Sequence, residues 1–167
     1  MVGTTISGSY TTSVTLSTPA TQNPATISGT GRINVTATSG SALYGTNAAA
    51  WAVYNYGTLI GPARGVFLTA GGTVTNESGG LISGGNRGVD ITGAVGAVTN
   101  AGSIAGGTQQ GARLTGGGSV TNASGGQISG GGIYGAIYIR HGGTVSNAAS
   151  GTITGPVQIY EIGRAHV

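Results

Sequence analysis

Short runs of alternating apolar and polar residues recur along the chain, and each run ends at Gly or Asn. Apolar residues at every second position lie on one face of a β-strand, so each run predicts a short strand with one buried face. One recurring run is an apolar residue, a small residue and Gly. Its copies are Ile6-Ser7-Gly8, Ile27-Ser28-Gly29, Leu59-Ile60-Gly61, Ile82-Ser83-Gly84, Ile104-Ala105-Gly106, Ile128-Ser129-Gly130 and Ile153-Thr154-Gly155. Apart from a wider gap between Ile27 and Leu59, the copies lie roughly 21 to 25 residues apart, a period typical of solenoids.

Two further alternating runs fall within each period. The first has the copies Val66-Phe67-Leu68, Val89-Asp90-Ile91, Ala112-Arg113-Leu114, Ile137-Tyr138-Ile139 and Val157-Gln158-Ile159. The second is centred on Val53, Val74, Val98, Val120 and Val145. Three strands per period predict an all-β fold in which each period is one coil of a parallel β-helix. Coils stacked about 4.8 Å apart would place like residues above like and bury columns of Val, Ile and Leu.

An Asn follows each central Val by two residues, at Asn55, Asn76, Asn100, Asn122 and Asn147. Asn tolerates the left-handed backbone conformation and can hydrogen-bond its own backbone or the Asn of the next coil. We therefore expect these residues to turn the chain and to form a structural Asn ladder. Glycine pairs such as Gly71-Gly72 and Gly117-Gly118 mark further sharp turns.

Composition narrows the class of protein. The 167 residues include 36 Gly, and 5% are charged while 38% are apolar, which favours an ordered β-rich chain over a disordered one. The net charge of +3 comes from scattered arginines, which argues against a nucleic-acid surface. The absence of Cys excludes disulfides and thiolate metal sites and is compatible with export. The sequence has neither an apolar run of membrane-spanning length nor the basic start and apolar core of a signal peptide.

The coils written "VTNAGSIAGG", "VTNASGGQISGG" and "VSNAASGTITG" resemble the passenger domains of bacterial autotransporters and related type V secreted adhesins. The resemblance runs from about Thr5 to Tyr160 and is strongest from Val53 onward. It implies a right-handed parallel β-helix on the outer surface of a Gram-negative bacterium. An export signal and a C-terminal translocator barrel, both parts of that family, are not in the sequence, so we expect a fragment of a longer protein whose partner for export is an outer-membrane translocator.

The domain prediction is one β-helix over residues 1–160, less regular over 1–52 and regular over 53–160. The last seven residues, "EIGRAHV" from Glu161 to Val167, leave the repeat abruptly. They are similar to the translation of a common sequencing adapter, which predicts a non-native tail. The alternative is a genuine polar C-terminus, since chain ends often depart from the fold.

Candidate catalytic groups are sparse. Before the tail the only carboxylates are Glu77 and Asp90, whereas hydrolases and lyases on β-helices need clustered carboxylates as acid and base or as calcium ligands. His141 lies beside a glycine turn without a nearby Cys or Asp to build a triad or metal site. We therefore expect no catalytic residues, no metal and no cofactor.

The outward positions suggest a binding surface. Phe67, Asp90, Arg113, Tyr138 and Gln158 come from successive coils and are predicted to form one exposed column with an Asp90–Arg113 ion pair. This column is either ordinary cross-strand decoration or a contact stripe for sugar or protein surfaces. A second set, Thr73 and Thr75 with their counterparts in later coils, is similar to the Thr rows of ice-binding solenoids, but Ala97 and Ser119 interrupt it.

The function expected from these observations is that of a non-catalytic stalk and adhesin at the cell surface. Its partners would be proteins or glycans on host cells, on other bacteria or in a matrix. A carbohydrate-binding module, a β-helix polysaccharide lyase or hydrolase, and an ice-binding solenoid remain as alternatives.

Overall fold

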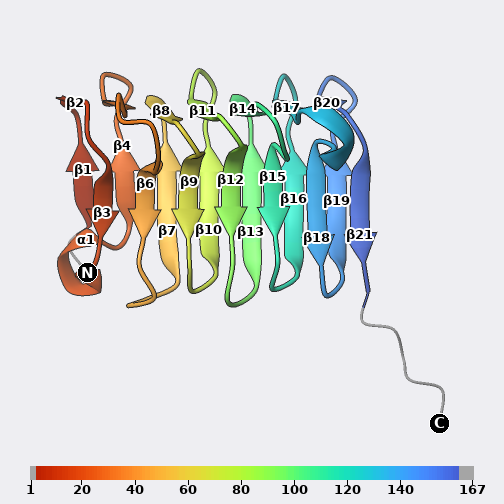
Figure 1. Ribbon diagram of the computed structural model, residues 1–167, viewed down its shortest axis with the longest axis horizontal. Helices are drawn as coiled ribbons and strands as arrows, with labels where there is room; N and C mark the ends of the chain where they lie inside the picture. The colour runs from red at the N-terminus through yellow and green to blue at the C-terminus, as the bar shows by residue number, and fades with distance from the viewer. Residues whose placement is uncertain (1–2, 162–167) are drawn as a thin grey trace, which may run out of the picture.

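The alternating runs form short strands that stack into three parallel sheets of seven strands each in the computed structural model, which describes residues 3–161 (Figure 1). This arrangement confirms the predicted all-β parallel β-helix, with roughly 23 residues per coil. Each coil contributes one strand to each of the three sheets, called A, B and C in the order in which the chain passes through them.

Sheet A consists of β1 (Thr4–Ile6), β4 (Ala25–Ile27), β7 (Trp51–Asn55), β10 (Gly72–Asn76), β13 (Gly96–Asn100), β16 (Gly118–Asn122) and β19 (Gly143–Asn147). Sheet B consists of β2 (Ser9–Tyr10), β5 (Arg32–Asn34), β8 (Thr58–Gly61), β11 (Leu81–Gly84), β14 (Ser103–Gly106), β17 (Gln127–Ser129) and β20 (Thr152–Thr154). Sheet C consists of β3 (Val14–Leu16), β6 (Ser41–Gly45), β9 (Arg64–Leu68), β12 (Arg87–Ile91), β15 (Ala112–Leu114), β18 (Ile137–Arg140) and β21 (Val157–Tyr160). Two short helical turns, α1 (Pro19–Gln22) and η1 (Gly132–Tyr134), lie in connections between strands.

The coil is right-handed. In Figure 1 the chain rises along sheet A at the back, crosses the top through sheet B and descends along sheet C at the front, while the coils advance from left to right. Right-handed crossovers are the usual connection between parallel strands. Sheet C forms one continuous face of the molecule, the face toward the viewer in Figure 1.

Like residues stack in the core as predicted. Val74 pairs with Val53 on one side and Val98 on the other, and Ile82 pairs with Leu59 and Ile104 in the same way. Because successive coils share this register, the apolar columns are continuous, and these six side chains have at most 1% of their surface exposed. A single coil could not bury its apolar face, so the stability of each coil depends on its neighbours.

The first two coils depart from the repeat assignment made from sequence. Ile27 pairs with Asn55 in sheet A, whereas Ile33 pairs with Leu59 in sheet B. Placing Ile6 and Ile27 in the row of Ile82 was therefore wrong. An apolar residue, a small residue and Gly suit the end of any strand before a turn, and in these two coils Ile occupies the position that Asn takes from β7 onward.

The structure places the five predicted ladder residues in one column, with direct hydrogen bonds between successive side chains. The Nδ2 atoms of Asn55, Asn76, Asn100 and Asn122 each donate to the Oδ1 atom of the next Asn at 2.8 Å. These four residues are fully buried, and each Nδ2 also donates to backbone carbonyls. The ladder thus supplies partners for amides that would otherwise be costly to bury.

The predicted left-handed backbone at these Asn residues is wrong. Among residues 3–161, His141 is the only residue other than Gly with a positive φ, and the Asn residues are the last residues of extended strands. The turns are made by Gly. At Gly118, where φ is +133°, a Cβ atom would collide with the backbone of Gly96 in the preceding coil.

Ile104 provides a simple test of the stacked core. It is fully buried, so Ile104→Val is expected to lower the free energy of unfolding by about 1 kcal/mol through the lost methylene and the small cavity. Val95→Ala, at a turn residue that is 68% exposed, should have almost no effect. Urea unfolding followed by circular dichroism measures both changes. An equal loss in the two variants would contradict the assignment of the inward face.

Candidate functional site

The outward side chains at the centre of sheet C form one column along the solenoid. The pairing of neighbouring strands places Phe67 beside Asp90, Asp90 beside Arg113, Arg113 beside Tyr138, and Tyr138 beside Gln158. All five residues of the predicted stripe therefore lie in the predicted order. The column continues toward the N-terminus through Tyr44, which pairs with Phe67.

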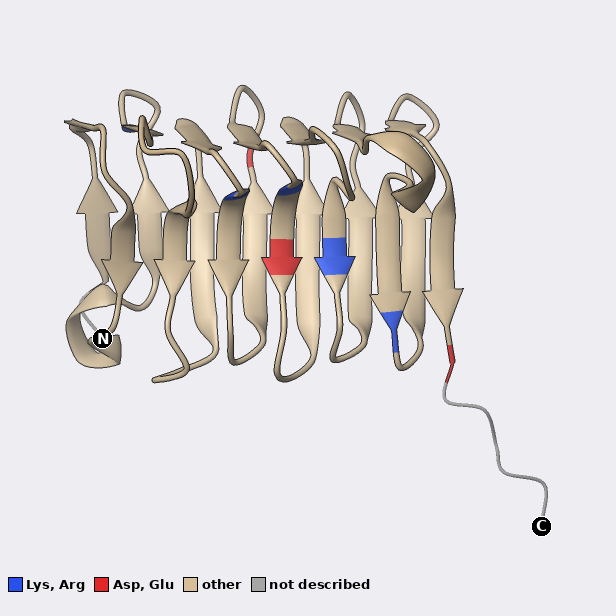
Figure 2. Cartoon of the chain, in the orientation of Figure 1, with Lys and Arg blue, Asp and Glu red and all other residues tan. Residues whose placement is uncertain are grey.

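Asp90 is at the centre of a cluster of arginines. Its Oδ1 atom accepts a hydrogen bond from Nε of Arg113 at 2.8 Å, and its Oδ2 atom accepts one from Nε of Arg64 at 2.8 Å and one from Nη2 of Arg113 at 3.1 Å. Nη1 of Arg87 is 3.6 Å from Oδ2. In Figure 2 the acidic segment of β12 adjoins basic segments of β9, β12 and β15 on the front face.

The prediction that Asp90 is exposed is wrong. Its side chain has 0% exposure, whereas the side chains of Arg64, Arg87 and Arg113 are 28%, 17% and 24% exposed. The carboxylate is short and the guanidinium groups are long, so the arginines cover it. Asp90 therefore holds the arginines in place and does not itself present a contact surface.

Arg64 and Arg87 were not identified from the sequence. They pair with each other across β9 and β12, at the start of each strand and before its alternating part. The repeated triplets Arg64-Gly65-Val66 and Arg87-Gly88-Val89 are the sequence signal that could have located them. Tyr44 was missed for a different reason, because the longer second coil hid the correspondence between "ALYG" and the later sheet C strands.

Arg87 is the most confined of the three arginines. Its Nε atom donates to Oε1 of Gln110 at 3.1 Å. Burial lowers the pKa of Arg87, repulsion from Arg113 and Arg64 lowers it further, and attraction to Asp90 and Tyr134 acts in the opposite direction. Burial is the largest cause of this lowered pKa, and the neighbouring arginines add to it.

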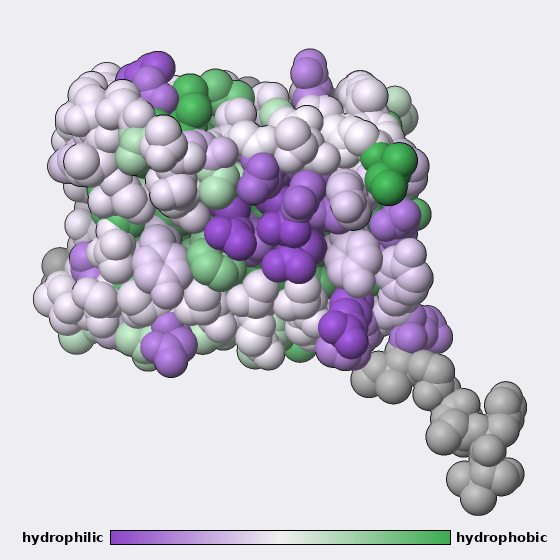
Figure 3. Space-filling view, viewed as in Figure 1, coloured by the Kyte–Doolittle hydropathy of each residue, from purple (hydrophilic) through white to green (hydrophobic). Residues whose placement is uncertain are grey.

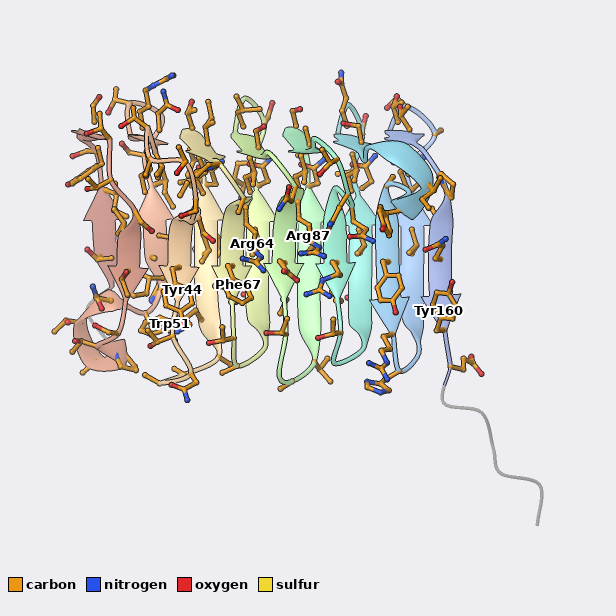
Figure 4. The ribbon with its side chains drawn as sticks, viewed as in Figure 1. Tyr44, Trp51, Arg64, Phe67, Arg87 and Tyr160 are labelled. Carbon is orange, nitrogen blue, oxygen red and sulfur yellow. The ribbon has the colours of Figure 1, made fainter. Side chains whose placement is uncertain are left out.

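Aromatic rings lie on both sides of the arginines. The rings of Tyr44 and Phe67 stack with their centroids 5.6 Å apart, and the Cζ atom of Arg64 lies 4.2 Å from the centroid of the Phe67 ring. On the other side Tyr138 is followed by Tyr160, with ring centroids 5.3 Å apart. Figure 4 shows Tyr44, Phe67, Arg64 and Arg87 on adjoining strands, with Tyr160 toward the C-terminal end. We call Arg64, Arg87, Arg113 and Asp90 with these flanking rings the arginine face.

The space-filling view shows the arginine face as a hydrophilic patch in the middle of sheet C, over β9, β12 and β15 (Figure 3). Charge is concentrated here, whereas 5% of the whole sequence is charged. The cation–π contact of Arg64 and the two bonds from Arg113 to Asp90 restrict the arginine side chains before any ligand arrives. The face is thus a preorganised set of cations between aromatic rings.

The Thr rows lie on sheet A. Thr75 pairs with Thr99, but its other neighbour is Tyr54, and Thr73 lies between Ala52 and Ala97. The hydroxyl array is therefore interrupted on both sides of β10. Ice binding depends on an ordered lattice of hydroxyl groups, so these interruptions argue against the ice-binding alternative.

The His and acidic side chains outside the arginine face do not gather into a second site within residues 3–161. Within that range no three His, Cys, Asp or Glu side chains come together as metal ligands would. Nδ1 of His141 is 2.9 Å from the carbonyl oxygen of Thr115, at a turn where the backbone φ of His141 is 65°. Glu77 follows the end of β10 in sheet A, whereas Asp90 is in sheet C.

The predicted tail falls almost wholly outside the described residues. Glu161 is exposed and follows β21, and residues 162–167 are not described. Within residues 3–161 there is no helix with the length and apolar character needed to span a membrane.

Comparison with known proteins gave no relative. No protein-family model matches the sequence, and the searches of curated proteins and of solved structures gave no match.

Proposed function

We propose that the chain is part of a surface-displayed passenger of the autotransporter type, where it acts as a non-catalytic stalk that presents an adhesive face. The observation that carries this proposal is the continuous outward column of sheet C, which places Tyr44, Phe67, Arg113 and Tyr138 in register over successive coils. A solenoid of this kind offers an extended wall, and flat walls bearing aromatic and basic side chains suit the binding of large surfaces.

Support for a non-catalytic role comes from the state of the acidic residues. Catalysis by acid and base, or by calcium, requires carboxylates that converge on a substrate. Both oxygens of Asp90 are occupied by arginine donors, and Glu77 follows the end of a strand in a different sheet. A lyase or hydrolase would need a different set of residues.

Display on the bacterial surface tests the passenger proposal. In this experiment the chain is inserted in place of the passenger of a laboratory autotransporter, between the export signal and the translocator of that protein. We expect intact bacteria to carry it as a protease-resistant core and to attach more strongly to host-cell layers or to glycan-coated surfaces. The matched control is Asn100→Asp, whose weakened ladder should make the displayed core sensitive to protease.

The outcomes separate the alternatives. Retention inside the cell, while the original passenger is exported normally, would contradict the passenger proposal. If the chain is displayed but attachment does not increase, the adhesive role is contradicted and only the role as a stalk is supported. Release of new reducing or unsaturated sugar ends from polygalacturonate by the purified chain would favour the lyase or hydrolase alternative.

A further inference from the structure

The arginine face carries more positive charge than it can neutralise. Three guanidinium groups surround one carboxylate, so two positive charges have no acidic partner among residues 3–161. The lowered pKa of Arg87 reflects burial together with the repulsion between these arginines. A bound anion would relieve that repulsion, as the carboxylate of Asp90 does in part.

Donors that could hold such an anion are free. Within the described chain, Arg64 uses only Nε in a hydrogen bond, to Asp90, and Arg87 uses only Nε, to Gln110. Nη1 of Arg113 also makes no hydrogen bond there. All three side chains are partly exposed, and a guanidinium fork matches the geometry of carboxylate and sulfate groups.

The aromatic rings on either side of the arginines indicate which kind of molecule bears the anionic group. Tyr44 and Phe67 precede the arginines along the column, and Tyr138 follows them, with the ring of Tyr160 from the next strand 5.3 Å from its own, centroid to centroid. Partly exposed aromatic side chains beside charged groups suit contact with sugars, so this order suits a chain of sugars whose charged groups meet the arginines. An acidic peptide would gain little here, because the free backbone groups of a sheet lie at its edges and not on its face.

We propose that the arginine face is a binding site for an acidic polysaccharide, in which Arg64, Arg87 and Arg113 hold carboxylate or sulfate groups and the flanking aromatic side chains contact the sugar rings. This inference names the ligand class of the adhesive face and so rests on the proposed function. Asp90 acts as a positioning residue, because it orders Arg64 and Arg113 from beneath.

Titration calorimetry with the purified chain tests this site directly. The probes are polygalacturonate, which carries carboxylates, dextran sulfate, which carries sulfates, and uncharged dextran. We expect one or both acidic polymers to bind and the uncharged dextran not to bind. Whichever acidic polymer binds more tightly identifies the anionic group.

Arg87→Gln is the decisive variant, because Arg87 has the most distant contact with Asp90 and its loss leaves both bonds from Arg113 in place. It should weaken binding about tenfold, as expected for the loss of one charge-assisted contact. The matched control is Arg32→Gln, which removes the same charge from an exposed position on β5 in sheet B and should change the dissociation constant less than about twofold. If Arg87→Gln unfolds, Arg87→Lys keeps the charge and loses the fork, and it should weaken binding several-fold.

Three results would overturn the site. These are absence of binding to both acidic polymers, equal weakening by Arg87→Gln and Arg32→Gln, and equally tight binding of polyglutamate of the same charge. The last result would indicate an acidic protein partner. None of them affects surface display or protease resistance, so failure of this site is distinguishable from failure of the passenger proposal.

Discussion

Asn100→Asp is expected to lower the free energy of unfolding by about 4 kcal/mol, the largest loss among the variants considered. Asn100 is fully buried, and its Nδ2 atom donates to Oδ1 of Asn122 at 2.8 Å and to the carbonyl oxygens of Gly102 and Gln127. The variant has nearly the same shape but replaces this donor by a carboxylate oxygen that faces three acceptors. Either a negative charge is buried without a partner, or a proton is taken up and only one of the three bonds is restored.

The control for this variant lies in the same column. Asn147 is exposed, and its Oδ1 atom accepts a hydrogen bond from Asn122 that an aspartate could also accept. The bond that an aspartate would lose, from Nδ2 to the carbonyl oxygen of Gly151, is exposed to water. Asn147→Asp should therefore cost less than about 1 kcal/mol. Urea unfolding followed by circular dichroism compares the two variants. Similar losses at both positions would show that burial of the ladder is not the source of the effect.

Asp90→Asn is expected to cost about 2 to 3 kcal/mol, because it removes the only negative charge beneath three arginines. An amide can accept a bond at one position, but its Nδ2 atom would face an arginine donor. The expected loss in free energy of unfolding is smaller than that for breaking a fully buried ion pair, since the guanidinium groups are 17% to 28% exposed and water screens their repulsion. The surface position expected from the sequence would have made this substitution almost neutral.

The salt dependence of stability distinguishes two causes of the loss in Asp90→Asn, which are repulsion between the arginines and poorer packing. Raising the salt concentration to about 1 M shortens the screening length to about 3 Å, so part of the loss in Asp90→Asn should be recovered. Glu77→Gln, which removes the same charge from a residue outside the cluster, should be neutral at both salt concentrations. Thermal and urea unfolding at low and high salt measure these effects. A loss that does not respond to salt would point to packing and not to charge.

Most of the fold could be predicted from the alternation within each repeat and from the spacing between repeats. Alternation placed Val74, Ile82 and Ile91 on inward faces, and the common period placed like residues above like. Such patterns are readable because a parallel solenoid uses the same local register in every coil. They failed in the first two coils, where Ile27 occupies the place of an Asn and mimics a row from another sheet.

The candidate site was only partly predictable. The order of Phe67, Asp90, Arg113 and Tyr138 followed from the register alone. The contribution of Arg64 did not, because that residue reaches Asp90 from the start of a neighbouring strand and its hydrogen bond spans 26 residues of sequence. A regular repeat predicts which positions are neighbours, but it does not indicate how far a long side chain reaches across them.

Local pattern was therefore sufficient for the coil, the three sheets and the inward columns, since these depend on backbone periodicity and on the burial of apolar side chains. Packing between coils decided the rest. The Asn ladder itself followed from the repeat, but packing decided that Asn55, Asn76, Asn100 and Asn122 are fully buried at the ends of extended strands, and it covered Asp90 with three arginines. The physical reason is that the burial of a polar group depends on the length and charge of the side chains stacked beside it, which come from coils above and below and not from its own stretch of sequence.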